Sequence, residues 1–301
     1  MRAMVISGGG SKGAFAGGVA QYLLQQGRGG YDLFLGTSTG SLLISHLALN
    51  KIDKIRKVYT SVNQESIFSN CPFTIERKYG EASIGISHWN VVRNFLRGSK
   101  TFGESHNLLA LIKNTITPEE FHTLQTGPTD LVVTVSNLSL NQVEYKSIND
   151  FDYDEFCEWI WISCNYIPFM SLVRKNGCEY ADGGLGSMVP IEEAIRRGAR
   201  EVDAIILHTE VTHINRLPSR NAFSLLTNMG AFMLDRIEQQ NIRIGKFVAT
   251  HHDAIINFYY TPTVLTTNSL VFDKEQMTKW WESGFLYASA KAKRTSPLEP
   301  E

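Results

Sequence analysis

Gly36-Thr37-Ser38-Thr39-Gly40 lies between two apolar stretches of different length. Residues 31–35 before it are short and strand-like, whereas residues 41–49 after it are long enough for a buried helix. A Gly-x-Ser-x-Gly sequence between a strand and a helix is typical of a nucleophile elbow, in which glycines allow a tight turn and the serine is forced outward. The positive end of the following helix favours negative charge that develops near Ser38.

A glycine-rich turn lies near the start of the chain. Residues 4–7 predict a first strand and residues 14–24 a helix. The turn between them consists of Gly8, Gly9, Gly10, Ser11, Lys12 and Gly13. Such a turn exposes several backbone N–H groups in one concavity, which makes an anion site. The anion could be a dinucleotide pyrophosphate, because Gly8-x-Gly10-x-x-Gly13 fits the Rossmann pattern, or the oxyanion of a tetrahedral acyl intermediate. A turn made only for tight packing is the third interpretation.

The surrounding sequence argues against a nucleotide site. Dinucleotide binding needs an acidic residue at the end of the next strand, but that strand ends in Leu35-Gly36, and Asp32 stands at its beginning. The following turn holds the serine elbow, which a cofactor domain does not need. A P-loop is excluded because Lys12-Gly13 reverses the required order and no Ser or Thr follows a Gly-Lys pair.

The third motif is Asp182-Gly183-Gly184. It follows residues 173–179, which predict a β-hairpin with Asn176-Gly177 as its turn. The paired glycines let the backbone turn sharply after the aspartate. By itself the motif also fits an ordinary surface turn, so its meaning depends on the two motifs before it.

These three motifs together resemble those of the patatin-like phospholipases. That family has a Gly-x-Gly-x-x-Gly oxyanion motif, a Gly-x-Ser-x-Gly elbow and an Asp-Gly-Ala/Gly motif, in this order. Residues 8–13, 36–40 and 182–184 match them. Ser7 stands where the family often has aspartate, at a position that is not catalytic.

Two further segments extend the resemblance to about residues 3–210. Residues 163–169 loosely resemble the family's Ser-x-Ala-x-Pro-x-x-Phe segment, and residues 189–195 also fit. In the first segment, aligned on its proline, Cys164 replaces the serine and Tyr166 the alanine, and Phe169 comes two positions early. The resemblance implies a three-layer α/β fold with a central, mostly parallel sheet and helices on both faces. It also implies a catalytic dyad in which Asp182 takes the proton of Ser38.

A serine hydroxyl needs a base to become a nucleophile, and the usual base is histidine. Among the histidines His208 is the best candidate, because it ends a strand-like stretch, whereas His46 falls inside the helix after the elbow. None of the eight stands in a recognisable triad context: His46, His88, His106, His122, His208, His213, His251 and His252.

A carboxylate is the other candidate base. With an unperturbed pKa of about 3.9 it is weak, but partial desolvation raises its basicity. Much of the rate must then come from the oxyanion hole, with the N–H groups of Gly9 and Gly10 as donors. Lys12 either orients the loop, meets an anionic head group or is a solvated surface lysine.

Composition agrees with a soluble enzyme and argues against nucleic acid as its main partner. The 301 residues are enough for one large α/β domain, with 43% hydrophobic residues and a net charge of −1. No apolar run reaches 18 residues, which predicts no transmembrane segment, and no signal peptide is visible, which predicts a cytoplasmic location. The cysteines have no metal-type spacing and predict free buried thiols; they are Cys71, Cys157, Cys164 and Cys178. We expect neither a metal nor a cofactor.

Strands and helices alternate along the chain, as expected for one patatin-like domain over residues 1–301. We expect long helices at about 222–248 and 274–291 and a shorter one at 190–197, with a loose tail from about 293. The expected strands are 3–7, 31–35, 130–136, 142–147, 178–181, 202–208 and 254–260.

Residues 51–105 interrupt this alternation. They hold nine Lys or Arg and five acidic residues, a net charge of +4, together with seven Phe, Tyr or Trp. A helical insertion that caps the active site would fall here. Basic and aromatic residues suit peripheral contact with an anionic lipid surface, although an ordinary solvated face is an equally simple interpretation.

The sequence therefore predicts a serine acyl hydrolase acting on phospholipid or lysophospholipid, or on another lipid ester. A general carboxylesterase or an acyltransferase with the same dyad is the first alternative. A nucleotide-binding regulatory module is a remote one.

Overall fold

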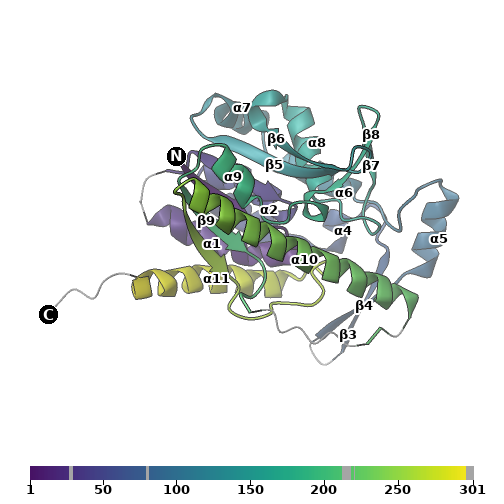
Figure 1. The fold of residues 1–301 in the computed structure, drawn as a ribbon. Helices are drawn as coiled ribbons and strands as arrows, with labels where there is room; N and C mark the ends of the chain where they lie inside the picture. The colour runs from purple at the N-terminus through teal and green to yellow at the C-terminus, as the bar shows by residue number, and fades with distance from the viewer. Residues whose placement is uncertain (27–29, 79–80, 212–217, 220, 296–301) are drawn as a thin grey trace.

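A mixed eight-stranded sheet forms the centre of the molecule in a computed structural model (Figure 1). The structure describes residues 1–26, 30–78, 81–211, 218–219 and 221–295, and for 76–78, 81–83 and 295 the backbone alone. The strand order is β10-β9-β1-β2-β5-β8-β7, with β6 paired to β5 off this path. The strands are β1 (Arg2–Ile6), β2 (Leu33–Thr37), β5 (Asp130–Asn137), β6 (Gln142–Ser147), β7 (Val173–Lys175), β8 (Cys178–Asp182), β9 (Glu201–Ile206) and β10 (Ile255–Tyr260).

Five adjacent strands, β10 to β5 in the sheet order, are parallel, and β6, β7 and β8 run antiparallel to their neighbours. The helices are α1 (Gly13–Gln25), α2 (Thr39–Ala48), α3 (Ile52–Ser61), α4 (Gln64–Ile67), α5 (His88–Leu96), α6 (His106–Thr115), α7 (Pro118–Thr126), α8 (Tyr153–Ser163), α9 (Ile191–Arg196), α10 (Ala222–His251) and α11 (Lys274–Thr295).

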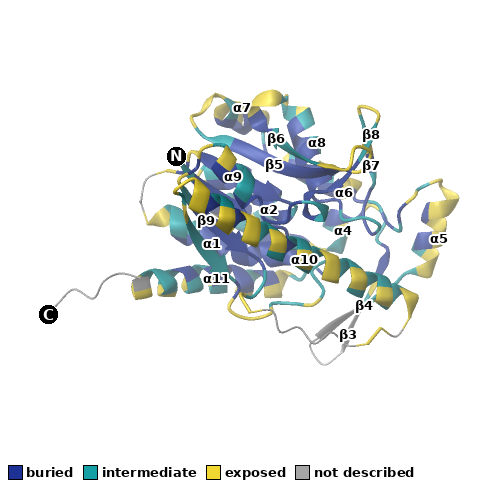
Figure 2. Cartoon of the chain, viewed as in Figure 1, coloured by how far each residue is buried: buried dark blue, intermediate teal, exposed yellow. Residues whose placement is uncertain are grey.

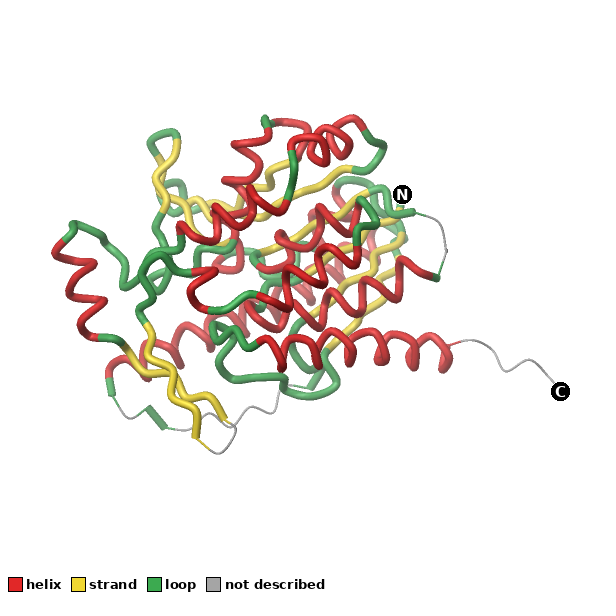
Figure 3. The backbone as a smooth tube through the Cα atoms, turned by 180° about the vertical axis from the view of Figure 1, so that it is seen from behind, coloured by secondary structure: helices red, strands yellow, loops and turns green. Residues whose placement is uncertain are grey.

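Helices cover both faces of the sheet, because side chains alternate along each strand. On β1, Met4 and Ile6 belong to a core that includes residues of α1, α2, α8 and α11. Ala3 and Val5 belong to a second core with residues of α9 and α10. Figures 1 and 3 show the molecule from opposite sides. The predicted three-layer α/β fold with a mostly parallel sheet is confirmed.

Every predicted strand is present, but several boundaries differ. The strand before the elbow spans 33–37 rather than 31–35. Tyr31 instead donates a hydrogen bond to buried Asp203, and Asp32 accepts one from the N–H of Arg2. The predicted hairpin forms from β7 and β8. α11 continues to Thr295, so a tail that is loose from 293 is wrong for its first residues, and 296–301 lie outside the described residues.

The segment 51–105 is not wholly helical, which corrects that expectation. It contains α3, α4 and α5, but also an antiparallel hairpin of β3 (Phe73–Lys78) and β4 (Glu81–Ile86). Phe73, Thr74 and Ile75 explain the first strand, because aromatic and β-branched residues favour extended backbone. In Figure 1 the hairpin and α5 extend from the body beside α10.

Candidate active site

Ser38 occupies a sharp turn between β2 and α2. Its backbone lies at φ 53°, ψ −119°, a conformation that serine rarely adopts. The turn also brings backbones close together: a Cβ on Gly36 would lie 2.5 Å from the carbonyl carbon of Gly40, and one on Gly40 would lie 2.3 Å from the carbonyl oxygen of Ile6. The glycines around Ser38 and the intervening Thr37 and Thr39 therefore form the tight turn that the motif predicts.

Strand β5 brings Asp182 to Ser38. The last residue of β2, Thr37, pairs with Thr134, and Asp182 at the end of β8 pairs with the next residue, Val135. Because β2 leaves the sheet at the elbow, β8 takes its place beside β5 from the opposite direction. The Oγ of Ser38 donates a hydrogen bond of 2.7 Å to Oδ2 of Asp182.

Burial makes the Asp182 carboxylate a stronger base than an exposed one. The side chain is only 5% exposed. Burial raises the pKa of Asp182 from 3.8 to about 7, and the hydrogen bonds from Ser38 and the N–H of Gly184 oppose that rise. The Gly184 bond is 2.7 Å to Oδ1, so the two oxygens have separate partners. Oδ2 is thereby directed at the serine.

The glycine-rich loop lies across the elbow. Gly8 and Ser11 use their N–H groups within the fold, on the carbonyls of Met188 and Ser269. Within the described part of the chain, the N–H groups of Gly9 and Gly10 donate to no protein acceptor, and both residues line the cavity that contains Ser38. Gly13 begins α1, so the loop leads directly into a helix.

A tyrosine from the insertion helps to hold this loop. The carbonyl oxygen of Gly10 accepts hydrogen bonds from Thr39 at 2.9 Å and from Tyr59 of α3 at 2.7 Å, and the two hydroxyls also contact each other. Gly10 itself has φ +57°, and a Cβ there would lie 2.3 Å from the carbonyl oxygen of Ser269. Sequence reasoning did not find Tyr59, because no local pattern distinguishes it from other core tyrosines.

The segment 163–165, where the motif match is loose, contacts the elbow on its other side. The N–H of Ser38 donates to Oγ of Ser163 at 2.8 Å, and the thiol of Cys164 donates to the carbonyl of Ser38 at 3.2 Å. The carbonyl of Asn165 accepts from the N–H of Asp182 at 2.9 Å. One short segment therefore holds both members of the Ser38–Asp182 pair.

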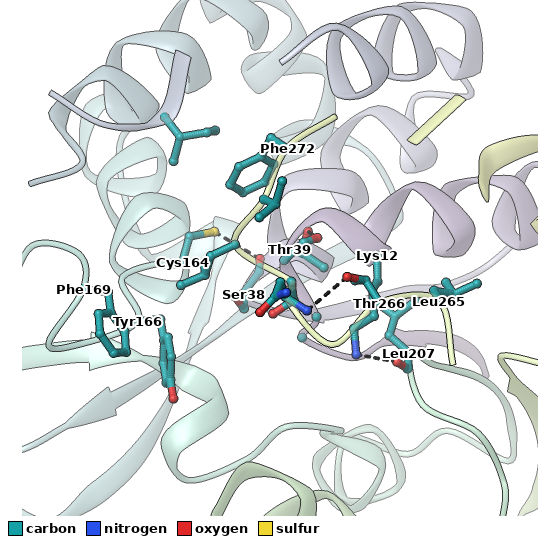
Figure 4. Close-up of a pocket in the computed structure, with 18 of the residues that line it drawn as sticks. Lys12, Ser38, Thr39, Cys164, Tyr166, Phe169, Leu207, Leu265, Thr266 and Phe272 are labelled. Atoms are coloured by element: carbon teal, nitrogen blue, oxygen red, sulfur yellow. Dashed lines mark hydrogen bonds between the residues drawn. The ribbon is translucent and has the colours of Figure 1, made fainter. Parts of the chain in front are cut away.

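Lys12 is buried, which excludes a solvated surface lysine. Its ammonium donates to the carbonyl of Leu207 at 2.7 Å (Figure 4). It also lies 3.5 Å from Nε2 of His208. His208 in turn contacts two carboxylates of α10: Nδ1 lies 2.8 Å from Glu238 and Nε2 lies 3.2 Å from Asp235. The cluster ties the glycine-rich loop to α10.

His208 has the environment of a charged group and not of a catalytic base. Burial and nearby Lys12 lower the pKa of His208, but Glu238 and Asp235 outweigh them, so the pKa is raised overall. In the described part of the chain, Asp182 is the one hydrogen-bond partner of the Ser38 hydroxyl. His46 is a buried residue of α2 whose Nε2 lies 3.2 Å from the carbonyl oxygen of Thr115, and His213 lies outside the described residues.

A cavity of about 1700 Å³ opens above Ser38. Tyr166 and Phe169 lie on one side of it in Figure 4, while Leu265, Thr266 and Phe272 approach from the C-terminal segment. The part of the lining formed by α2, α3, α4 and α6 contains a group of apolar side chains beside the polar Thr39, His46, Tyr59 and Thr115. The apolar side chains, including that of the residue after α3, are Leu42, Ile55, Val58, Val62, Ile67, Leu108, Leu111 and Ile112.

Other site classes are less well supported by the described residues. No group of three or more His, Cys, Asp or Glu side chains there is arranged to hold a metal ion. All four cysteines are free; Cys157 and Cys164 are buried, but Cys71 and Cys178 are partly exposed, which corrects the expectation that all are buried. None of the helices described is both long enough and apolar enough to cross a bilayer.

Comparison with known proteins places the chain in one family. The family model of the patatin-like phospholipases matches residues 4–195. Among solved structures, VipD from Legionella pneumophila is similar, with a TM-score of 0.45 and 13% identity, over 97% of this chain and 67% of that one. A search of curated proteins produced no significant match. Since the family model covers well over half of the sequence, the chain belongs to the patatin-like phospholipase family, a family of lipid acyl hydrolases.

Proposed function

We propose that the chain is a lipid acyl hydrolase of the phospholipase A or lysophospholipase type, in which Ser38 is the nucleophile and Asp182 its base. One observation carries the proposal: a hydroxyl on a strained turn donates at 2.7 Å to a buried carboxylate. That distance lies within the range over which a proton can be transferred directly.

The reaction has two halves, acylation of Ser38 and hydrolysis of the acyl-enzyme, and Asp182 acts as the base in both. Ser38 Oγ attacks the ester carbonyl carbon while its proton passes to Oδ2 of Asp182, and the carbonyl oxygen becomes an oxyanion. The N–H groups of Gly9 and Gly10 are the donors we assign to that oxyanion; removal of one such donor typically costs about 100- to 1000-fold in rate. The proton then moves from Asp182 to the departing alcohol. Asp182 then takes a proton from a water molecule that attacks the acyl-Ser38 ester, and it returns that proton to Ser38 Oγ as the fatty acid leaves.

The cavity supports a substrate with long acyl chains. Sites for small molecules usually measure about 300–1000 Å³, whereas this one measures about 1700 Å³. Its apolar lining residues, which include Leu42, Ile55 and Leu108, suit a hydrocarbon chain. Each buried methylene contributes about 0.8 kcal/mol, so a chain of several carbons would bind without polar contacts.

We place the protein in a reducing compartment such as the cytoplasm, which its free cysteines support. We also expect peripheral contact of the protein with a membrane surface. We also propose that residues 1–301 form one domain, since β1, β9 and β10 lie in one sheet and α11 packs on α1.

A fluorophosphonate probe tests this function in one experiment. We expect the protein to be labelled at Ser38 and the Ser38→Ala variant to be unlabelled, folded and inactive on a lipid panel read by mass spectrometry. Labelling of that variant at the wild-type rate would exclude Ser38 as the nucleophile. A protein that is never labelled and hydrolyses no lipid would instead be a binding module.

A further inference from the structure

Helix α5 exposes most of its apolar side chains to solvent. Asn90 and Asn94 face the protein together with the apolar Val91, while Trp89 is 78% exposed and Leu96 is 83% exposed. Val92 and Phe95 are exposed on the same helix. A surface helix of a globular protein normally shows the reverse pattern. Figure 2 shows the exposed side of α5 facing away from the body of the protein.

Hydrogen bonds fix the helix in this orientation. Nδ2 of Asn90 donates to the carbonyl of Cys71 at 2.8 Å, and Nδ2 of Asn94 donates to the carbonyl of Thr101 at 2.9 Å. Rotation of the apolar side toward the protein would break the buried bond to Thr101 and the partly buried bond to Cys71, and loss of a buried hydrogen bond is costly. The apolar side therefore remains available to a partner.

Positive charge accompanies the apolar side. Residues 88–100 contain Arg93, Arg97 and Lys100 and no acidic residue. Lys100 pairs with Glu179, whereas Arg93 and Arg97 form no ion pair with any described residue. At 100° per residue, both arginines lie beside the stripe of Trp89, Val92 and Leu96. An aromatic and aliphatic stripe next to arginine is the pattern of helices that lie in the surface of anionic membranes.

The same region borders the active-site cavity. Ile84, Ile86 and His88, at the junction of β4 and α5, line the cavity. So do Phe223, Thr227 and Ala231 of α10.

The outer side of α10 at this point is also apolar. Leu225, Met229, Phe232 and Met233 are exposed, and residues 222–233 carry no charge. Phe95, Phe102, Phe169 and Phe223 form a row of ring contacts, with successive centroids 5.9–6.0 Å apart, which connects α5 to the start of α10. The two apolar surfaces thus belong to one region around the cavity.

We propose that α5 and the first three turns of α10 dock the protein on a surface of anionic phospholipid, with the cavity opening toward that surface. The inference rests on the proposed function, because that surface would supply the ester. A lipid surface fits better than a protein partner, because the charged residues of 88–100 are all basic and the apolar residues beside them are exposed. Acidic head groups would pair with Arg93 and Arg97, while Trp89 and Leu96 enter the acyl boundary.

Tryptophan fluorescence can report this docking without a label. The chain has five tryptophans, and Trp89 is exposed while Trp159, Trp161, Trp280 and Trp281 are buried. The experiment uses the Ser38→Ala variant, so that vesicles are not hydrolysed. With phosphatidylglycerol vesicles we expect a blue shift of the emission and quenching by brominated acyl chains, and a much smaller effect with phosphatidylcholine vesicles.

Matched substitutions locate the contact. In the Ser38→Ala background, Trp89→Ser with Leu96→Ser should lower vesicle partitioning at least tenfold, as measured by co-sedimentation. Phe247→Ser with Leu286→Ser, at exposed positions on other surfaces, should leave it unchanged. Arg93→Gln with Arg97→Gln should remove the preference for anionic vesicles, whereas Arg200→Gln with Arg243→Gln should keep it.

With Ser38 present, the Trp89 and Leu96 variant should retain hydrolysis of a soluble ester and lose hydrolysis of vesicle lipid. The docking would be overturned if the control substitutions lowered vesicle partitioning as much as the test substitutions. It would also be overturned if the protein did not bind anionic vesicles at all. Binding of a second copy or a protein by α5 with no lipid binding would overturn it too. Failure of soluble-ester hydrolysis in the wild-type protein would overturn the proposed function and leave the docking result readable.

Discussion

Replacement of Asp182 by asparagine should raise the stability of the fold at pH 8 while it removes activity. The asparagine side chain can keep both contacts, because its Oδ1 would accept from the N–H of Gly184 and its Nδ2 would donate to Ser38 Oγ. What changes is the charge. A buried carboxylate with only a hydroxyl and one N–H as partners is destabilising when ionised.

The direction with pH follows from the raised pKa. The folded protein holds the Asp182 proton up to about pH 7, whereas the unfolded chain releases it near 3.8. The contribution of Asp182 to the free energy of unfolding is therefore fully present below pH 3.8. It falls between pH 3.8 and pH 7 and is lost above pH 7. The folded-state pKa of Asp182 lies about 3 above the unfolded one. This difference corresponds to a loss of at most about 4 kcal/mol in the free energy of unfolding at pH 8. Between pH 5 and pH 8 the loss is about 2–3 kcal/mol.

Thermal unfolding of the wild type and the Asp182→Asn variant at pH 5 and pH 8 measures this effect. We expect the variant to gain more at pH 8 than at pH 5, by about 2 °C for each kcal/mol. On a soluble ester its kcat should fall by about 10⁴, the size of the same change at the base of a serine protease triad.

Asp203 is the matched control for a buried aspartate. It is equally buried, but it accepts hydrogen bonds from Arg2, Tyr31 and Asn257. Asp203→Asn should therefore lower the melting temperature at both pH values, because it leaves Arg2 partly unpaired. A melting temperature of Asp182→Asn that is lowered to the same extent at pH 5 and pH 8 would refute the account of a buried, weakly paired carboxylate.

Two further predictions concern the groups around this pair. His208→Ala should change kcat on a soluble ester by less than about tenfold, because Asp182 remains the base. Activity of this variant should still fall below pH 7, where Asp182 holds a proton. A loss as large as that of Asp182→Asn would assign the base to His208. Activity on the same ester should survive chelators, since a Ser–Asp mechanism requires no metal ion; complete loss that added metal restores would contradict this.

The sequence was most informative where a turn depends on neighbouring residues alone. Gly36 predicts the elbow because the space that it leaves is filled by the backbone of Gly40 and Ser41 in the same turn, whereas the space at Gly40 is filled by Ile6 of β1. The hairpin around Asn176-Gly177 follows from local turn chemistry in the same way. The alternation of strands and helices predicts the layers, because each strand must be covered on both faces.

Long-range contacts could not be read from the sequence. Tyr59 reaches Gly10 from an insertion, and Ser163 reaches the N–H of Ser38 across 125 residues. No periodicity indicates such pairings, because they depend on how helices pack after the sheet has formed. The 73–86 hairpin is hard to predict for a different reason. Its β-pattern is short and lies within a segment, 51–105, that is rich in charged and aromatic residues.

The pairing of β5 with β8 decides whether Ser38 and Asp182 meet. A shift of one residue in this register would turn the Asp182 side chain to the other face of the sheet, away from the elbow. Gly183 opposes such a shift: it lies so close to Thr134 that a Cβ there would come within 2.2 Å of the carbonyl oxygen of Thr134. Thr134 is also the partner of Thr37, the residue before the nucleophile. The glycine of the aspartate motif and the end of the elbow strand thus contact one residue of β5, and this shared contact sets the 2.7 Å approach of Asp182 to Ser38.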